Sequence, residues 1–421
     1  MSSHFPPNPY RPGSGEEPPY FAGRQEAFIK LRQARDAIAE GGGSSPMVVS
    51  GLRGIGKTVL LAQMRAKLEQ DGWLVSPVVA FGSKRRLQTV WKLLHKGLRE
   101  HDNKVPRLTG RRWNLGPLDL SAKAGASTSP TSPIALAPEV GLGLSGRLER
   151  NTPAYDHERL LREIQELAKW GERRHKGQSR PGIALLLDEC QDAVLPDLAT
   201  LADAGQEAAV GKWPLLIVLA GLPTTHDRLV KVRSFATRFP PIPIGKLSAT
   251  EAIDALRIPA TQRRVDFEAA ALDAALEFAQ GVPYHLQVIG QQAWEHQDLG
   301  KRTITLASVQ AGYPLAREAI EVGMYQPLWR KASEEERRYL RSMLLAGRDH
   351  EGFLVAGLLA HLGKSHTESA SIRRRLIDKG IIHQTTHGHL EYSYPGFDTY
   401  LQTKEDIALP GKLSLTTTPD L

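Results

Sequence analysis

The stretch Gly51-Leu52-Arg53-Gly54-Ile55-Gly56-Lys57-Thr58 decides the fold of this 421-residue chain. It fits G-x-x-x-x-G-K-[ST], the pattern of a loop whose glycines let backbone N–H groups surround phosphate oxygens. The apolar residues 47–50 before it predict a buried strand, and residues 59–68 after it have helical periodicity. A glycine-rich turn that fits by accident is the alternative, and the strand and helix on its two sides argue against it. The sequence therefore predicts a nucleotide-binding loop at the positive end of a helix dipole.

Each side chain of the loop has an expected role. The Lys57 ammonium is expected to reach the β- and γ-phosphates and to assist catalysis, and the Thr58 hydroxyl is expected to hold Mg²⁺. Contacts with ATP or ADP are expected from the loop and the start of its helix, that is from Gly51, Gly54, Ile55, Gly56, Lys57, Thr58 and Val59.

A pair of acids ends the next strongly apolar run. Residues 182–187 are almost continuously apolar and lead into Asp188 and Glu189, as a buried parallel strand does when it carries acids to a site. Asp188 is expected to hold Mg²⁺ opposite Thr58, and Glu189 to polarise the attacking water. Solvated carboxylates at an exposed strand end are the alternative. Cys190, beside them, is interpreted as a packing residue.

Composition narrows the class of protein. The chain has 41% hydrophobic and 24% charged residues, as globular proteins do. Its single cysteine excludes an internal disulfide and fits a reducing cytoplasm. The first residues lack the apolar core of a signal peptide, and no apolar run approaches the ~20 residues of a membrane span. A cytoplasmic protein without a membrane partner is expected, and the net charge of +8 weakly favours anionic partners.

The chain divides into regions of different composition. Capping boxes at Ser248–Glu251 and Ser333–Glu336 predict the starts of two helical regions. We expect an α/β fold with a parallel P-loop sheet in three layers, a helical lid and a C-terminal winged helix. The regions are a flexible Pro-rich arm (1–18), the P-loop core (19–246, with an insertion at about 107–151), the lid (247–329), the winged helix (330–402) and a tail (403–421).

Five segments together resemble a known family. They are YFAGR at 20–24, the P-loop, LDECQ at 187–191, RF at 238–239 and GVP at 281–283. Their order resembles AAA+ ATPases of the origin-recognition/initiator type, which have an ASCE-type sheet, and the related STAND signalling ATPases. The layout is also similar to a bacterial, mostly actinobacterial, group of ATP-binding proteins. The resemblance extends over residues 8–402.

The resemblance implies further site residues. Gly23 and Arg24 match the element that borders the adenine pocket, although a helix-capping turn is the alternative. Pro283 matches a proline that packs near the base and sugar. Arg238 matches an arginine presented to the γ-phosphate of a neighbouring subunit, which implies a homo-oligomer on ATP binding; a surface salt bridge is the alternative.

Two departures from the family pattern point to slow or switch-like hydrolysis. A polar sensor residue is expected immediately beyond Ala220, but the chain has glycine, leucine and proline at 221–223, and its first hydroxyl there is Thr224. The lid segment 281–285 lacks the arginine that typical AAA+ lids direct at the γ-phosphate. His285, the titratable residue there, is interpreted as a packing histidine.

The C-terminal region carries a basic helix before a hairpin at Gly388. Arg373, Arg374, Arg375 and Lys379 lie on that helix and could meet DNA phosphates. Three consecutive helical positions spread over about 200° of arc, so the arginines cannot all face one groove. A protein-docking or autoinhibitory cover is the alternative. Three functions therefore remain open: an ATPase that acts on DNA, a STAND-like signalling switch, and a nucleotide-binding scaffold that does not hydrolyse ATP.

Overall fold

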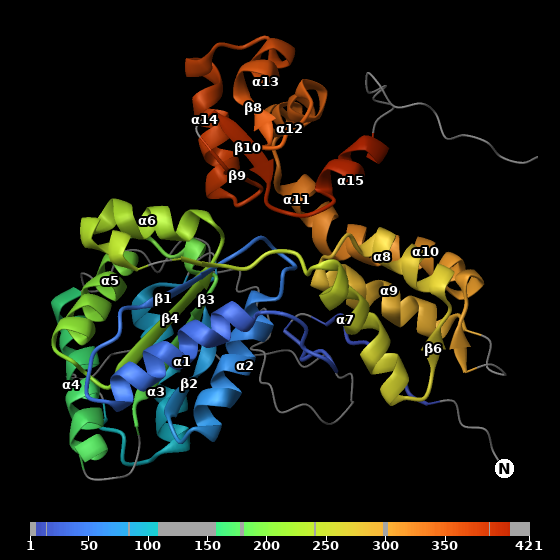
Figure 1. Cartoon of the computed structure of the whole chain (residues 1–421). Helices are drawn as coiled ribbons and strands as arrows, with labels where there is room; N and C mark the ends of the chain where they lie inside the picture. The colour runs from blue at the N-terminus through green and yellow to red at the C-terminus, as the bar shows by residue number, and fades with distance from the viewer. Residues whose placement is uncertain are drawn as a thin grey trace, which may run out of the picture.

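The computed structural model describes residues 6–13, 15–82, 85–107, 157–176, 181–239, 241–297, 302–386 and 388–404. Figure 1 shows an α/β core, a helical region beside it and a C-terminal region above both. The insertion expected at about 107–151 and the tail expected at 403–421 lie almost entirely outside the described residues. Within the described part of the chain, no helix combines the length and the apolar character that crossing a bilayer requires.

The core is built on a parallel sheet of five strands in the order β2-β3-β4-β1-β5. The strands are β1 (Met47–Ser50), β2 (Leu74–Ala80), β3 (Ile183–Asp188), β4 (Leu215–Gly221) and β5 (Pro241–Pro243). Ser50 pairs with Gly221, and Ala80 pairs with Asp188. Because the strands all run the same way, the segments that follow β1, β3 and β4 meet at one edge of the sheet, where ligands bind in such folds.

Helices cover both faces of the sheet and give the predicted three layers (Figure 1). Helices α1 (Gln25–Ala39) and α2 (Lys57–Gln70) cover one face, and the other face is covered by α3 (Leu87–His101), α4 (His157–Lys176), α5 (Leu195–Val210) and α6 (Thr224–Val232). Ala184 and Leu186 of β3 are buried with the first pair of helices, and Leu185 and Leu187 are buried toward the other face. Short 3-10 helices, η1 (Cys190–Asp192) and η2 (Ser234–Arg238), follow β3 and α6.

The lid begins where its capping box predicts. The Ser248 side chain accepts from the N–H of Glu251, and the Glu251 carboxylate accepts from the N–H of Ser248. Two short parallel strands, β6 and β7, join the lid helices. The elements are α7 (Ala249–Gln262), β6 (Asp266–Phe267), α8 (Ala269–Ala279), α9 (Pro283–Glu295), β7 (Thr303–Ile304), α10 (Leu306–Ile320), the π-helical η3 (Glu321–Tyr325) and α11 (Gln326–Lys331).

The C-terminal region begins at the second capping box, between Ser333 and Glu336. A three-stranded antiparallel sheet in the order β8-β10-β9 packs with its helices. The elements are α12 (Glu334–Ala346), β8 (Phe353–Leu354), α13 (Val355–Leu362), α14 (His366–Asp378), β9 (Ile382–Gln384), β10 (His389–Tyr392) and α15 (Phe397–Lys404). The helices and the hairpin expected here are present, and their assignment as a winged helix stays a prediction.

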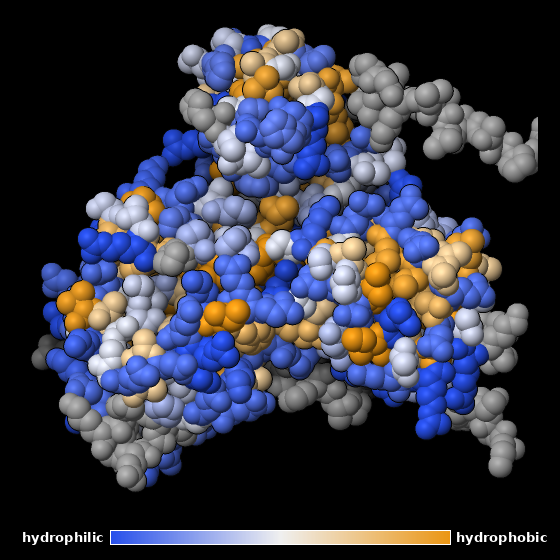
Figure 2. Space-filling view, viewed as in Figure 1, coloured by the Kyte–Doolittle hydropathy of each residue, from blue (hydrophilic) through white to orange (hydrophobic). Residues whose placement is uncertain are grey.

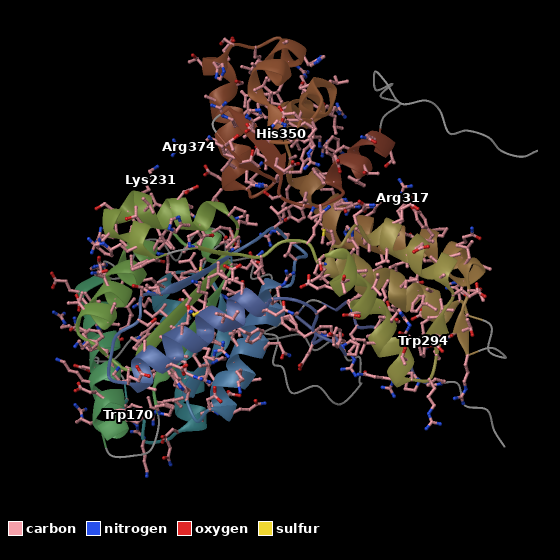
Figure 3. All side chains as sticks on the ribbon, in the orientation of Figure 1. Trp170, Lys231, Trp294, Arg317, His350 and Arg374 are labelled. Carbon is pink, nitrogen blue, oxygen red and sulfur yellow. The ribbon has the colours of Figure 1, made fainter. Side chains whose placement is uncertain are left out.

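Part of the N-terminal segment is placed differently from the flexible arm expected for residues 1–18. Tyr10 is only 2% exposed, and its hydroxyl donates to the carbonyl oxygen of Leu256 at 2.6 Å. Its ring lies edge-on to Trp294 of the lid, with the ring centroids 6.3 Å apart (Trp294 is labelled in Figure 3). A buried aromatic ring therefore anchors this segment to the lid, a contact that its proline and glycine content does not reveal.

Candidate nucleotide-binding site

The P-loop joins β1 to α2 at the carboxyl edge of the sheet. Gly54 has φ 74° and Gly56 has φ 91°, a left-handed backbone region that favours glycine. The N–H of Gly51 donates to the carbonyl oxygen of Gly221 at 3.1 Å, so the loop is tied to the end of β4. The predicted strand–loop–helix context is confirmed.

Lys57 is buried inside the curve of the loop, with 6% of its surface exposed. Its Nζ donates to the carbonyl oxygens of Gly51 at 3.0 Å and Leu52 at 2.8 Å. Burial lowers the pKa of Lys57, while the charges of Glu189 and Asp188 oppose that shift. The ammonium therefore lies among carbonyl oxygens of the loop. A phosphate bound in the loop would compete with these oxygens for the ammonium.

Thr58 and Asp188 are in direct contact. The Thr58 hydroxyl donates to Oδ2 of Asp188 at 2.6 Å, and the carboxylate is 2% exposed. Burial raises the pKa of Asp188, and the charge of Glu189 raises it further, whereas the Thr58 hydrogen bond and Lys57 lower it. Hydroxyl and carboxylate oxygens are hard ligands of the kind that Mg²⁺ takes. The donor atoms at this point therefore fit the expected metal.

Glu189 stands just beyond the strand in a left-handed backbone conformation, with φ 51°. Such a conformation costs on the order of 1–3 kcal/mol for a residue other than glycine. Its Oε1 accepts from Nη1 of Arg53 at 3.1 Å, and its Oε2 accepts from Nε2 of Gln191. The carboxylate is therefore held from both sides, by the P-loop and by η1. Cys190, next in the chain, is fully buried in the core, and burial raises its pKa, in agreement with the expected packing role.

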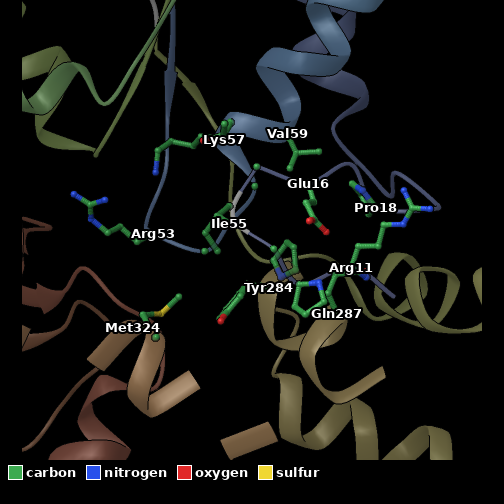
Figure 4. A pocket seen from close by; sticks show the side chains of 18 of the residues that line it. Arg11, Glu16, Pro18, Arg53, Ile55, Lys57, Val59, Tyr284, Gln287 and Met324 are labelled. Atoms are coloured by element: carbon green, nitrogen blue, oxygen red, sulfur yellow. The ribbon is translucent and has the colours of Figure 1, made fainter. Parts of the chain in front are cut away.

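A cavity of about 780 Å³ opens beside the P-loop, within the range of small-molecule sites. Figure 4 shows Ile55 of the P-loop near Tyr284 of α9 at this cavity, with the charged ends of Arg53 and Lys57 directed away from α9. Apolar surface is visible in Figure 2 below the C-terminal region, where the core and the lid face each other. The cavity is lined by Val59 and the other residues of 53–59, by residues 20–22, by lid residues and by the N-terminal segment.

The G-R element supports the loop. Nη2 of Arg24 donates to the carbonyl oxygen of Ile55 at 2.8 Å, and Arg24 lines the cavity. Burial lowers the pKa of Arg24, and the nearby Glu251 opposes that shift. Gly23 has φ 71°, and a Cβ there would lie 2.8 Å from the Glu251 carboxylate. Arg24 therefore lines the cavity and holds the P-loop, and Gly23 packs against Glu251 beside it. The role of both residues at the adenine stays a prediction.

The start of α9 contacts both the cavity and the P-loop. Pro283, the first residue of the helix, lines the cavity. The N–H of Tyr284 donates to the carbonyl oxygen of Gly54 at 3.2 Å. His285 is buried, and burial and the charge of Lys246 lower its pKa to about 4, so it is neutral at pH 7.

Arg238 lies apart from these residues. It ends η2 and is exposed, and it does not line the cavity. Among the described residues its side chain makes no hydrogen bond or ion pair. Its predicted role toward a neighbouring subunit stays a prediction.

The C-terminal region contacts the P-loop, which the sequence did not reveal. The N–H of Arg53 donates to the carbonyl oxygen of Ser393 at 3.2 Å, and its guanidinium lies 5.6 Å from the centroid of the Tyr394 ring. A Cβ at Gly380 would lie only 2.9 Å from Leu222, just beyond β4. Arg53 occupies an unspecified position of the P-loop pattern, so its sequence context gave no signal.

The predicted DNA-contacting cations are partly used inside the C-terminal region. Lys379 pairs with the buried Glu336 at 2.6 Å. Arg375 pairs with Glu335 at 3.2 Å and with Glu336 at 3.5 Å. Arg374 extends into solvent, with 80% of its side chain exposed (Figure 3). Arg375 and Lys379 are therefore already paired with carboxylates of α12, and the exposed Arg374 lies 3.9 Å from the carboxylate of Asp378 on its own helix.

Comparison with known proteins agrees with this architecture. A family model described as an AAA ATPase domain matches residues 20–218, and one described as a domain of unknown function (DUF8462) matches residues 322–401. No curated protein matches the chain.

Solved structures of two proteins are similar over nearly the whole chain. The Walker-type ATPase PABY2304 of Pyrococcus abyssi is 14% identical with a TM-score of 0.55, and the match covers 96% of this chain and 100% of that one. The ORC2 protein of Aeropyrum pernix, in ADPNP–ADP complexes, is 14% identical with a TM-score of 0.55, and the match covers 93% and 97%. Residues 20–218 thus match the AAA ATPase domain in sequence, and the chain as a whole has the fold of an AAA+ P-loop ATPase.

Proposed function

We propose that this protein binds ATP with Mg²⁺ and hydrolyses it slowly, using the nucleotide to switch the position of its C-terminal region. The observation that carries the proposal is the meeting of Thr58, Asp188 and Glu189 beside a cavity of about 780 Å³. Those residues come from the P-loop and from β3, which the sheet brings to one edge.

The chemistry of each side chain determines its proposed role. Lys57 exchanges its contacts with loop carbonyls for the β- and γ-phosphates, where an ammonium offsets negative charge. Thr58 and Asp188 would hold Mg²⁺, and the ion would supply positive charge against the developing negative charge of the phosphates. Glu189 orients a water for attack on the γ-phosphorus and accepts its proton. Arg238 acts on the neighbouring subunit of a homo-oligomer.

The contacts of the P-loop with both other regions support a switch. The loop backbone bonds to the lid at Tyr284 and to the C-terminal region at Ser393. A net contribution of about 1 kcal/mol per hydrogen bond makes these contacts breakable. ATP breaks these contacts only by binding the released state more tightly, and a preference of a few kcal/mol, a fraction of the about 8 kcal/mol of a micromolar Kd, is enough. A change in loop conformation on nucleotide binding can therefore release the C-terminal region.

A spin-label distance tests the switch. Lys231→Cys on α6 and Arg374→Cys on α14 place labels on elements that face each other (Figure 3), and the native Cys190 is too buried to react. In the Glu189→Gln background we expect a longer distance with ATP and Mg²⁺ than with ADP. Lys169→Cys with Lys231→Cys, both within the core, is the control pair and should not change. Identical distributions for the first pair in both nucleotides would contradict the switch.

A further inference from the structure

The side chain of Gln191 joins the acid pair to the end of β4. Its Nε2 donates to Oε2 of Glu189, and its Oε1 accepts from the N–H of Leu222 at 3.0 Å. A backbone N–H only donates and an ionised carboxylate only accepts, so the two contacts require the same orientation of the amide. Gln191 is therefore fixed at both ends of its side chain.

The main chain of Gln191 is held independently of Glu189. Nη1 of Arg228, on α6, donates to the carbonyl oxygen of Gln191, and Nη2 donates to that of Ala193 at 2.6 Å. Arginine keeps its charge and its planar fork suits two neighbouring acceptors. The turn that carries Gln191 is thus fastened to α6 as well as to β4, and the amide is already in place to orient the carboxylate.

The same geometry explains the glycine at the end of β4. A Cβ at Gly221 would lie 3.0 Å from Oε1 of Gln191 and 2.2 Å from Oγ1 of Thr225. The resemblance to AAA+ ATPases implies a polar side chain immediately beyond Ala220. The space for such a side chain is filled by Gln191 and Thr225, and the polar group facing the acid pair comes from η1.

We propose that Gln191 is the positioning residue for the Glu189 carboxylate, in place of a polar side chain on β4. This inference rests on the proposed hydrolysis of ATP. Gln191 binds Oε2 of Glu189, whereas Arg53 binds Oε1. If the Arg53 side chain shifts when the C-terminal region moves away, Gln191 still orients the Glu189 carboxylate.

Isosteric variants test the role in turnover. Gln191→Leu removes both hydrogen bonds and should lower kcat roughly tenfold or more, because a misplaced base loses attack geometry. The KM for ATP and the affinity for an ATP analogue should stay within about threefold, since Gln191 does not line the cavity. Gln165→Leu is the matched control: its amide also donates to a carboxylate, that of Glu207, but between α4 and α5.

Gln191→Glu gives a readout that a merely structural role would not produce. It places two carboxylates in contact, so one of them retains a proton to higher pH. The acid limb of the kcat profile should move to higher pH. In thermal melts, Gln191→Glu should be less stable than Gln191→Leu at pH 8, and the difference should close near pH 4, where carboxyl groups of ordinary pKa about 4 become protonated. The exchange Gln191→Glu with Glu189→Gln should restore stability without restoring turnover.

The outcomes separate the two proposals. Absence of phosphate release by the wild-type protein would refute the proposed hydrolysis, and the pH-dependent melts would still decide whether Gln191 holds Glu189. Equal kcat for wild type and Gln191→Leu would overturn the positioning role. A constant stability difference between Gln191→Glu and Gln191→Leu from pH 4 to pH 8 would show that the two side chains do not touch.

Discussion

The hydroxyl of Thr58 donates a 2.6 Å hydrogen bond to the carboxylate of Asp188, although the two residues lie 130 positions apart. The contact exists because β1 and β3 are parallel strands on either side of β4, so the segments that follow them end at the same edge. It brings a hydroxyl and a carboxylate oxygen, both suited to Mg²⁺, to the point where a phosphate would enter the P-loop.

The first prediction concerns Lys57. Lys57→Ala should lower ATP affinity about 10- to 100-fold, because one charge-assisted phosphate contact contributes about 1.5–3 kcal/mol. The melting temperature should not fall, since the buried ammonium is poorly solvated and its pKa is lowered by burial. Lys67→Ala, on the exposed side of the same helix, is the control. Titration with an ATP analogue measures the effect. Unchanged affinity in Lys57→Ala would contradict the assignment of the P-loop as the nucleotide-binding site.

The second prediction concerns Arg238. Because its side chain is exposed and lies outside the cavity, Arg238→Ala should lower phosphate release without lowering ATP affinity. Mixing Arg238→Ala with Lys57→Ala should partly restore turnover, since one subunit would supply the intact pocket and the other the arginine. A mixture no more active than the sum of its parts would contradict action on a neighbouring subunit.

The third prediction concerns pH. Burial lowers the pKa of His285 to about 4, and burial lowers that of His383 to about 4. Between pH 4 and an unfolded-state pKa of about 6.5, the unfolded chain binds more protons, so stability falls as pH falls through this window. Between pH 7.5 and 5, His285→Gln should flatten that fall by an amount on the order of 2 kcal/mol, and the exposed His361→Gln should not. Denaturant unfolding at pH 7.5, 6 and 5 measures how the free energy of unfolding changes with pH. If this free energy changes with pH equally in His285→Gln and in the wild type, the prediction is wrong.

The fourth prediction concerns DNA. Because Arg375 and Lys379 are paired with Glu335 and Glu336, at most two of the four predicted cations remain for phosphates. Any duplex binding should therefore have a slope of log affinity against log salt no steeper than about −2. The double change of Arg373 and Arg374 to Ala should remove that slope, whereas Lys169→Ala on α4 should not. A slope near −4 in the wild type would show that the paired cations leave their carboxylates to meet DNA.

Much of the core was predictable from local patterns. The P-loop and the Asp188–Glu189 pair are short motifs at strand ends, and the apolar runs 47–50 and 182–187 marked the strands β1 and β3. The capping boxes at Ser248 and Ser333 also predicted where the helices α7 and α12 begin.

What could not be predicted rests on contacts between distant segments. The sequence places Tyr10 in a proline-rich arm, and only the folded structure shows that the lid buries its ring. Arg53 occupies an unspecified position of the P-loop pattern, and its contact with Tyr394 depends on how the C-terminal region docks. Gln191 ends the LDECQ segment, and its contact with Leu222 depends on the pairing of β3 with β4. The pairing of Lys379 with Glu336 likewise depends on the packing of α14 on α12, which cannot be inferred from the number of charged residues.

The central claim is that Glu189 activates water for ATP hydrolysis at this site. Steady-state phosphate release and ATP affinity, measured for wild type and Glu189→Gln with Mg²⁺, test it most directly. The account predicts slow release by the wild type, a loss on the order of 10² or more in Glu189→Gln, and ATP affinity that is unchanged. Glu207→Gln, outside the cavity, should behave as the wild type. Equal release by wild type and Glu189→Gln, or none by the wild type, would contradict the account.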